Sequence, residues 1–211
     1  NRLDFITFHI EKINRGLVLL HQDLGLPWSD HKQALRLDSE RLFSKESLNP
    51  QFFSIYYSDE SNLEKQAALG KLLFYDPVLS ANNERACSSC HQPDRAFTDG
   101  LKTSMAFNME GSVQRNAPTL LNVLYQKAFF YDGKAYQLEQ QIRDVVHNEH
   151  EMGAKLSDVV LKLRGSEEYK KLFKEAFTTK KDAAISEYAI QKAIAEYEKT
   201  LISMNSRFDK Y

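Results

Sequence analysis

Apolar residues along this chain recur mainly at helical spacing, three or four positions apart. The clearest run lies between residues 6 and 24, ahead of Gly25 and Pro27, which are residues that end helices. Its members are spaced 4, 3, 4, 3 and 4 positions apart: Ile6, Ile10, Ile13, Leu17, Leu20 and Leu24. The pattern predicts one amphipathic helix, and such a stripe is typical of a face packed on its own domain.

Other segments predict further helices. Ser61 and Glu64 have the spacing of a capping box, and the helix that they open would end at Asp76-Pro77. Its apolar side would consist of Leu63, Ala67, Leu72 and Leu73. Four more helices are predicted, near residues 138–145, 159–164, 169–176 and 186–201. No strand-like alternation competes with them, so the expected fold class is all-α.

Two stretches lack this regularity. Residues 29–60 predict a wrap or linker anchored by aromatic rings, namely Phe52, Phe53, Tyr56 and Tyr57. Residues 92–118 hold two glycines and two prolines among polar residues and predict a long loop, which is usually a functional or mobile feature.

The composition indicates a folded globular chain, with 42% hydrophobic and 27% charged residues among 211. The net charge of −1 gives no general basic field, so nucleic acid is not an expected partner. No apolar run approaches the roughly 20 residues of a membrane span. The chain begins at Asn1 without a charged-then-apolar leader, which is typical of a mature or trimmed protein.

The strongest chemical signal is the sequence Cys87-Ser88-Ser89-Cys90-His91. Two thiols and an imidazole at this spacing are what covalent attachment of a c-type haem requires. The thiols of Cys87 and Cys90 would form thioethers with the porphyrin, and His91 would bind the iron. We therefore expect one covalent haem c, and because its attachment is a maturation step outside the bacterial cytoplasm, a periplasmic location.

Two other interpretations of this motif stay open. A redox-active CxxC pair would be expected in a βαβ pattern, and no buried strand precedes Cys87. A zinc site would need two further ligands from distant histidines, which form no second tight cluster with cysteine. These histidines are His9, His21, His31, His147 and His150.

From about Leu69 onward, the chain resembles the bacterial dihaem cytochrome c peroxidases and their MauG-like relatives. The resemblance is carried by six blocks in the family's order: LGKLLFYDP (69–77), CSSCH (87–91), RNAPT (115–119), FYDGKA (130–135), EHEMG (149–153) and FDKY (208–211). It implies a cytochrome c-like haem domain over residues 61–211, corresponding to the family's N-terminal, peroxidatic haem. Residues 1–60 do not match and are interpreted as a helical extension.

The resemblance also assigns roles. His91 aligns with the proximal iron ligand, and the spacing from Tyr131 places the distal-pocket glutamine at Gln141 and the glutamate at Glu151. A carboxylate there could take a proton from one peroxide oxygen and return it to the departing oxygen. Burial beside a porphyrin would raise the pKa of Glu151 from roughly 4.3.

This sequence departs from the family in three ways. No histidine lies between His91 and His147 to shield the iron, so we expect an open or water-bound sixth site. Met105 or Met109, in the intervening loop, is the alternative sixth ligand.

Tyr131 stands where the family commonly has tryptophan, between its two haems. It is expected either on the electron path or as a buried aromatic wedge. The chain also holds one haem motif rather than two, which implies a fragment or one half of a two-chain assembly. Asn116 resembles an asparagine of the family's calcium site, so calcium is a second expected ligand.

The expected function is reduction of hydrogen peroxide to water, with electrons from a second haem domain or chain and from a small donor protein such as a cytochrome c or a cupredoxin. Self-association into a homodimer is a further expectation. One alternative is a monohaem electron-transfer cytochrome without peroxide chemistry, and another is a MauG-like haem oxidase. A non-haem helical scaffold is the remaining class.

Overall fold

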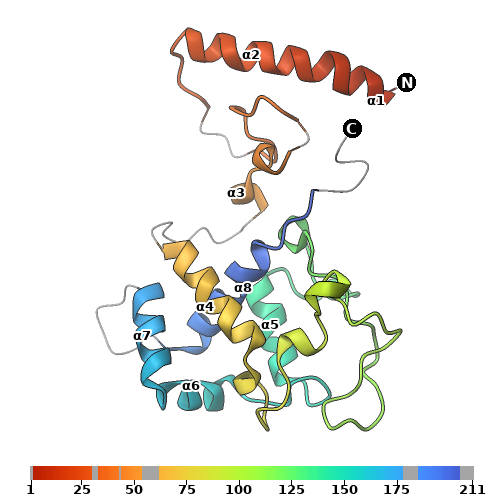
Figure 1. Cartoon of the computed structure of the whole chain (residues 1–211), viewed down its shortest axis with the longest axis vertical. Helices are drawn as coiled ribbons and strands as arrows, with labels where there is room; N and C mark the ends of the chain where they lie inside the picture. The colour runs from red at the N-terminus through yellow and green to blue at the C-terminus, as the bar shows by residue number, and fades with distance from the viewer. Residues whose placement is uncertain (1, 30–32, 43, 54–61, 178–184, 205–211) are drawn as a thin grey trace. The chain divides into compact units, whose positions relative to one another are not determined.

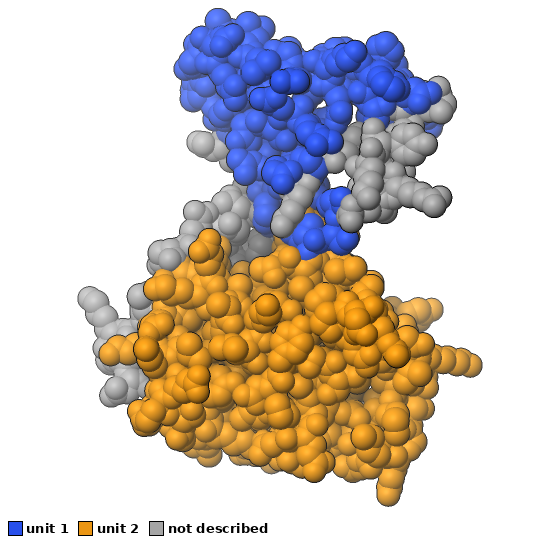
Figure 2. Space-filling view, in the orientation of Figure 1, with its two compact units in different colours: residues 1–57, 202–211 blue, residues 58–201 orange. Residues whose placement is uncertain are grey.

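The computed structural model describes residues 2–29, 33–42, 44–53, 62–177 and 185–204. The chain divides into two compact units, residues 1–57 with 202–211 and residues 58–201 (Figure 2). Some of the predicted features lie outside the described residues: Ser61, Tyr56, Tyr57, His31 and the block at 208–211.

The first unit opens with the predicted helix. It consists of α1 (Arg2–Phe5), a π-helical stretch (Ile6–Ile10) and α2 (Glu11–Asp23), and Gly25 follows with a φ of +62°, a conformation that suits glycine. The remainder contains a 3₁₀ turn (Lys45–Ser47) and α3 (Pro50–Phe53). In α3 the rings of Phe52 and Phe53 contact each other with centroids 5.1 Å apart.

The packing predicted for this helix was wrong. The apolar stripe is largely exposed, with Leu17 and Leu24 each 61% accessible, whereas Val18 is 3% accessible. The helix instead uses its polar side: Asn14 Nδ2 donates to the Ser39 carbonyl at 2.8 Å, and Arg15 pairs with Glu40 at 3.0 Å. Periodicity showed that the helix is amphipathic, but the local partner is a polar loop, which selects the other face.

The regular structure in the described part of the second unit is helical, with isolated bridges but no strand. Its α-helices are α4 (Leu63–Tyr75), α5 (Leu138–His147), α6 (Leu156–Arg164), α7 (Glu167–Ala176) and α8 (Glu187–Lys199). Its 3₁₀ turns are Pro77–Leu79, Cys87–Ser89, Pro93–Arg95 and Val123–Tyr125. The all-α prediction is confirmed, as are the five predicted helices and the irregular loop over residues 92–118.

The helix ends follow from local chemistry. The hydroxyls of Ser166 and Ser186 accept hydrogen bonds from the amides of Tyr169 and Ala189 and so open α7 and α8. At the end of α4, Asp76 leaves the helical conformation and accepts a hydrogen bond from the Val78 amide at 2.8 Å. Helix α4 is therefore directed into the turn that leads toward the cysteines.

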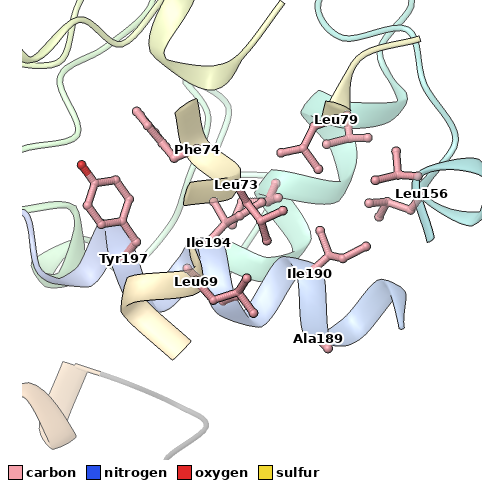
Figure 3. Close-up of a cluster of buried hydrophobic side chains, with 14 of the residues drawn as sticks. Leu69, Leu73, Phe74, Leu79, Leu156, Ala189, Ile190, Ile194 and Tyr197 are labelled. Atoms are coloured by element: carbon pink, nitrogen blue, oxygen red, sulfur yellow. The ribbon is translucent and has the colours of Figure 1, made fainter. Parts of the chain in front are cut away.

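Helices α4 and α8 lie side by side at the centre of this unit (Figure 1). Gly70 allows their close approach, because a Cβ built there would lie 1.8 Å from the Ala193 carbonyl oxygen. Around this contact the two helices form a buried apolar cluster with their neighbours (Figure 3): Leu69, Leu73, Phe74, Leu79, Leu156, Ala189, Ile190, Ile194 and Tyr197.

Of the four residues predicted for the α4 apolar side, only Leu73 belongs to this cluster. Leu63 and Ala67 are half-buried outside it, and Leu72 is 50% accessible, whereas Leu69 is buried. Positions four apart share a helix face, and α8 covers the face of Leu69 and Leu73. The face of α4 that packs is therefore set by Gly70 and its neighbours rather than by every apolar residue.

Candidate functional site

The two cysteines and the histidine lie on consecutive turns. Cys87–Ser89 forms a 3₁₀ turn, and both the Cys90 and His91 amides donate to the Cys87 carbonyl, at 3.2 and 3.0 Å. Both cysteines are free, and each residue is partly exposed. This compact turn therefore holds both thiols and the imidazole close together, without a disulfide between them.

His91 is oriented by the loop that follows it. Its Nδ1 lies 3.0 Å from the Phe97 carbonyl oxygen, which accepts a hydrogen bond when that nitrogen carries the proton. Ala96 and Phe97 adopt φ values of +54° and +58°, a region that non-glycine residues rarely occupy. Because Phe97 engages Nδ1, Nε2 is the nitrogen that would bind a metal, and a backbone hydrogen bond with Pro118 also acts on the imidazole. Burial lowers the pKa of His91 and so favours the neutral imidazole that ligation requires.

The thiol environments do not favour a redox pair. Burial, with the charge of Glu198, raises the pKa of Cys87 to about 12, and burial also raises the pKa of Cys90. Reactive CxxC cysteines need the opposite shift, because the thiolate is the nucleophile. The zinc interpretation also lacks support, since the described residues contain no group of three His, Cys, Asp or Glu side chains placed to hold a metal.

The surroundings of the motif fit a haem. Cys87 and Phe97 pack against the hydrophobic core, which provides an apolar setting for a porphyrin. One buried polar atom near Cys87 has no hydrogen-bond partner, namely Oε2 of Glu198, whereas the Ser104 hydroxyl hydrogen-bonds the Cys90 thiol. An unpaired buried polar atom costs about 1–3 kcal/mol, so the position of Glu198 suits a bound group that carries polar atoms of its own.

Glu151 lies in a tight turn after α5. Its amide and that of Gly153 donate to the Asn148 carbonyl, at 3.0 and 2.8 Å. Gly153 has a φ of +63°, and a Cβ there would lie 3.2 Å from the Phe107 ring, so glycine suits this position both conformationally and sterically.

The half-buried Glu151 carboxyl is part of the motif's surroundings, since its charge acts on Cys90. Burial raises the pKa of Glu151, against the opposing effects of Lys134, Arg85, an Asn148 hydrogen bond and His150. A raised pKa brings a carboxyl nearer to the range where it can both accept and return a proton.

The remaining predicted site residues are half-buried or exposed. Gln141 is half-buried on α5, next to the buried Ile142, and its backbone amide donates to the Gln137 carbonyl at 3.1 Å. Met105 and Met109 are 48% and 70% accessible. Asn116 is exposed as well.

Tyr131 is 91% accessible, and the Arg115 guanidinium lies 5.0 Å from its ring centroid. Within this chain it is therefore not a buried wedge. His147 has a structural contact, because its Nε2 accepts a hydrogen bond from the Leu156 amide at 3.1 Å where α6 begins. His150 is exposed, and its Nε2 lies 3.8 Å from Oε1 of Glu149.

Sequence reasoning missed Arg85, Ser104 and Glu198. Arg85 and Ser104 carry no local signal, because their contacts come from distant parts of the chain. Glu198 did carry one: it follows Ile194 by four positions and Ile190 by eight, which places a carboxyl on the apolar face of α8.

Comparison with known proteins identifies the family of this chain. The model of the family described as di-haem cytochrome c peroxidase matches residues 64–211. The chain belongs to this di-haem cytochrome c peroxidase family. Membership confirms the resemblance drawn from the six blocks and implies haem as the cofactor.

Individual relatives come from both branches of the family. The chain is 36% identical over 154 residues to the methylamine utilization protein MauG of Methylophilus methylotrophus, covering 73% of this chain and 44% of that protein. It is 36% identical over 147 residues to the cytochrome c551 peroxidase of Nitrosomonas europaea, covering 69% and 42%. A crystal structure of a MauG-like protein associated with microbial copper homeostasis aligns with a TM-score of 0.64 at 32% identity, covering 70% and 43%.

The chain thus spans less than half the length of each of these relatives. None of the described helices combines the length and the apolar character that crossing a bilayer requires.

Proposed function

We propose that residues 61–211 form the peroxidatic haem domain of a dihaem peroxidase, with residues 1–60 as a helical extension. Cys87 and Cys90 would hold one haem c through thioethers, and Nε2 of His91 would be its proximal ligand. Bound there, the haem supplies the iron at which hydrogen peroxide is reduced. Two observations support the proposal. The Phe97 carbonyl orients His91, whose pKa is lowered by burial, and Glu151 near the same CxxCH turn is half-buried with a raised pKa.

In this proposal Glu151 moves the proton. Its carboxylate accepts a proton from one oxygen of hydrogen peroxide and delivers it to the departing oxygen, which leaves as water. Lys134 and Arg85 keep the carboxyl ionisable despite its burial, because their positive charges oppose the desolvation effect. Gln141 would orient the peroxide or a water molecule through its amide. Two electrons and two protons then complete the conversion of one peroxide to two waters.

The electrons would come from outside this domain. We propose a second haem domain or chain as the immediate donor and a small cytochrome c or cupredoxin as its supplier, in the periplasm. The exposed Tyr131, with Arg115 beside its ring, is the proposed contact toward that second haem. We further propose an open or water-bound sixth iron site rather than Met105 or Met109, and calcium at Asn116 once the rest of its ligands are present.

A second candidate is a MauG-like oxidase acting on another molecule. The observation that favours it is the 36% identity to MauG, equal to that with the cytochrome c551 peroxidase. Both candidates use the same haem site, so the substrate that supplies the electrons separates them. Rapid turnover with a reduced donor cytochrome selects the peroxidase, and oxidation of a substrate without such a donor selects the oxidase.

The experiment that tests the proposal compares Glu151→Gln with Glu149→Gln in haem-loaded protein. Glu149 is a matched control, because it lies two residues away with a side chain 87% exposed. We expect the reaction with peroxide, followed by stopped-flow absorbance, to slow about 10²- to 10⁴-fold in Glu151→Gln and to change little in Glu149→Gln. Equal rates in the two variants would refute the proton role of Glu151.

A further inference from the structure

Arg85, two residues before Cys87, contacts three backbone carbonyls from two distant segments. Its Nη1 donates to Met105 at 3.0 Å and to Glu151 at 3.3 Å, and its Nη2 donates to Ala106 at 2.9 Å. The guanidinium carbon also lies 5.8 Å from the centroid of the Phe107 ring. One side chain therefore joins the start of the haem motif, the 105–107 loop and the Glu151 turn.

These contacts need a guanidinium. Its planar fork offers five N–H donors in fixed directions, whereas a lysine ammonium is a point charge on a flexible stem. The half-buried position of Arg85 and its charged donors strengthen each of these hydrogen bonds relative to a neutral, exposed one.

The loop that Arg85 holds is closed on itself but has few other links to Glu151. Within the loop, the Val113 amide donates to Ser104 at 2.9 Å and the Ala106 amide donates to Gly111 at 3.2 Å. Across to the Glu151 turn runs the backbone hydrogen bond from Phe107 to the His150 carbonyl at 2.8 Å. Arg85 adds the side-chain connection between the two.

We propose that Arg85 is a positioning residue that fixes the Glu151 turn against the haem motif and the 105–107 loop. It does so through the Glu151 carbonyl, so it acts on the proton-carrying carboxyl without transferring a proton itself. The inference rests on the role proposed above for Glu151.

Arg85 also contributes to the charge that faces Glu151, together with Lys134 and the imidazole of His150. Loss of one positive charge makes ionisation of Glu151 harder, so its pKa rises and the pH at which it becomes a base moves upward. Arg85→Lys would retain the positive charge but lose the planar set of N–H donors.

The test uses Arg85→Gln, Arg85→Lys and the control Arg164→Gln in haem-loaded protein. Arg164 also donates to a backbone carbonyl, that of Ile185 at 2.9 Å, but it is not among the groups that act on Glu151. One readout is the pH dependence of cyanide binding to the ferric haem, because hydrogen cyanide must lose its proton as it binds. The other is hydrogen exchange at the amides of Phe107, Glu151 and Gly153.

In Arg85→Gln we expect cyanide binding to slow on the order of tenfold to a hundredfold, its pH midpoint to rise, and exchange at the three amides to accelerate. Arg85→Lys should keep the midpoint yet still show accelerated exchange, and Arg164→Gln should show neither change. A uniform rise in exchange over the whole domain with an unchanged cyanide midpoint would overturn the proposal, as would no change in Arg85→Gln. If Glu151→Gln itself leaves the cyanide profile unaltered, the proposed function of Glu151 fails, and local exchange alone decides whether Arg85 positions the turn.

Discussion

The buried carboxyl of Glu198 should make the stability of the folded chain depend on pH, and one substitution should remove that dependence. Glu198 is 5% accessible, and its Oε2 has no hydrogen-bond partner. Burial, together with the charge of Glu139 and against that of Lys199, raises the pKa of Glu198 from 4.5 to about 8. The folded chain therefore holds a proton that the unfolded chain releases.

The sign and size follow from linkage. Below about pH 4.5 the carboxyl is protonated in both states, and its contribution to stability is fully present. As the pH rises to about 8 the unfolded state ionises first, so the free energy of unfolding falls. One pKa unit corresponds to about 1.4 kcal/mol, so the full change is worth up to about 5 kcal/mol.

Glu198→Gln keeps the shape of the side chain and removes its titration. We expect the variant to match the parent near pH 4.5 and to exceed its unfolding free energy by about 2–5 kcal/mol at pH 8. Urea unfolding followed by far-ultraviolet circular dichroism at both pH values measures this difference. The same pH slope in parent and variant would refute the reasoning.

Glu196 supplies a control, because its substitution by Gln should lower the free energy of unfolding rather than raise it. Glu196 pairs with Lys192 at 2.6 Å and with Lys199 at 2.9 Å, and the Lys192 side chain is only 2% exposed. Glu196→Gln weakens the pairing of a buried ammonium, so it should destabilise the chain by about 3 kcal/mol at neutral pH. A stabilised Glu196→Gln would show that this buried charge network does not behave as its geometry indicates.

Two further predictions concern the fold and the haem attachment. Gly70→Ala places a Cβ 1.8 Å from the Ala193 carbonyl oxygen and should lower the free energy of unfolding by about 3 kcal/mol, measured by thermal unfolding. The control Gly16→Ala has no atom within 4 Å of its added Cβ and should be neutral or slightly stabilising. Equal shifts in melting temperature would contradict the close α4–α8 contact. Cys87→Ser should leave at most one thioether, so that denaturing mass spectrometry finds less covalent haem than in Ser88→Ala, and undiminished attachment would exclude Cys87 as an anchor.

Much of the fold could be predicted because it follows from local patterns. The apolar positions of α8 and its Ser186 cap lie within a few residues of one another, so the sequence alone locates this helix. The choice of packing face is not local. The first helix contacts Ser39, Glu40 and Leu42 through its polar residues, and periodicity carries no information about that partner.

The residues of the candidate site also differ in how far local sequence predicts them. Cys87, Cys90 and His91 could be recognised because haem attachment needs them within five residues. Glu151 was placed only through resemblance to a family, since a single carboxylate has no distinguishing sequence signal. Arg85 reaches Glu151 across 66 positions in the sequence, a contact that folding alone creates.

The measurement that tests the central claim most directly is mass spectrometry of the proteolytic peptide containing Cys87–His91, taken from protein matured in a bacterial periplasm. The account predicts that this peptide carries one haem through two thioether bonds. Two unmodified thiols at Cys87 and Cys90 in such material would contradict it.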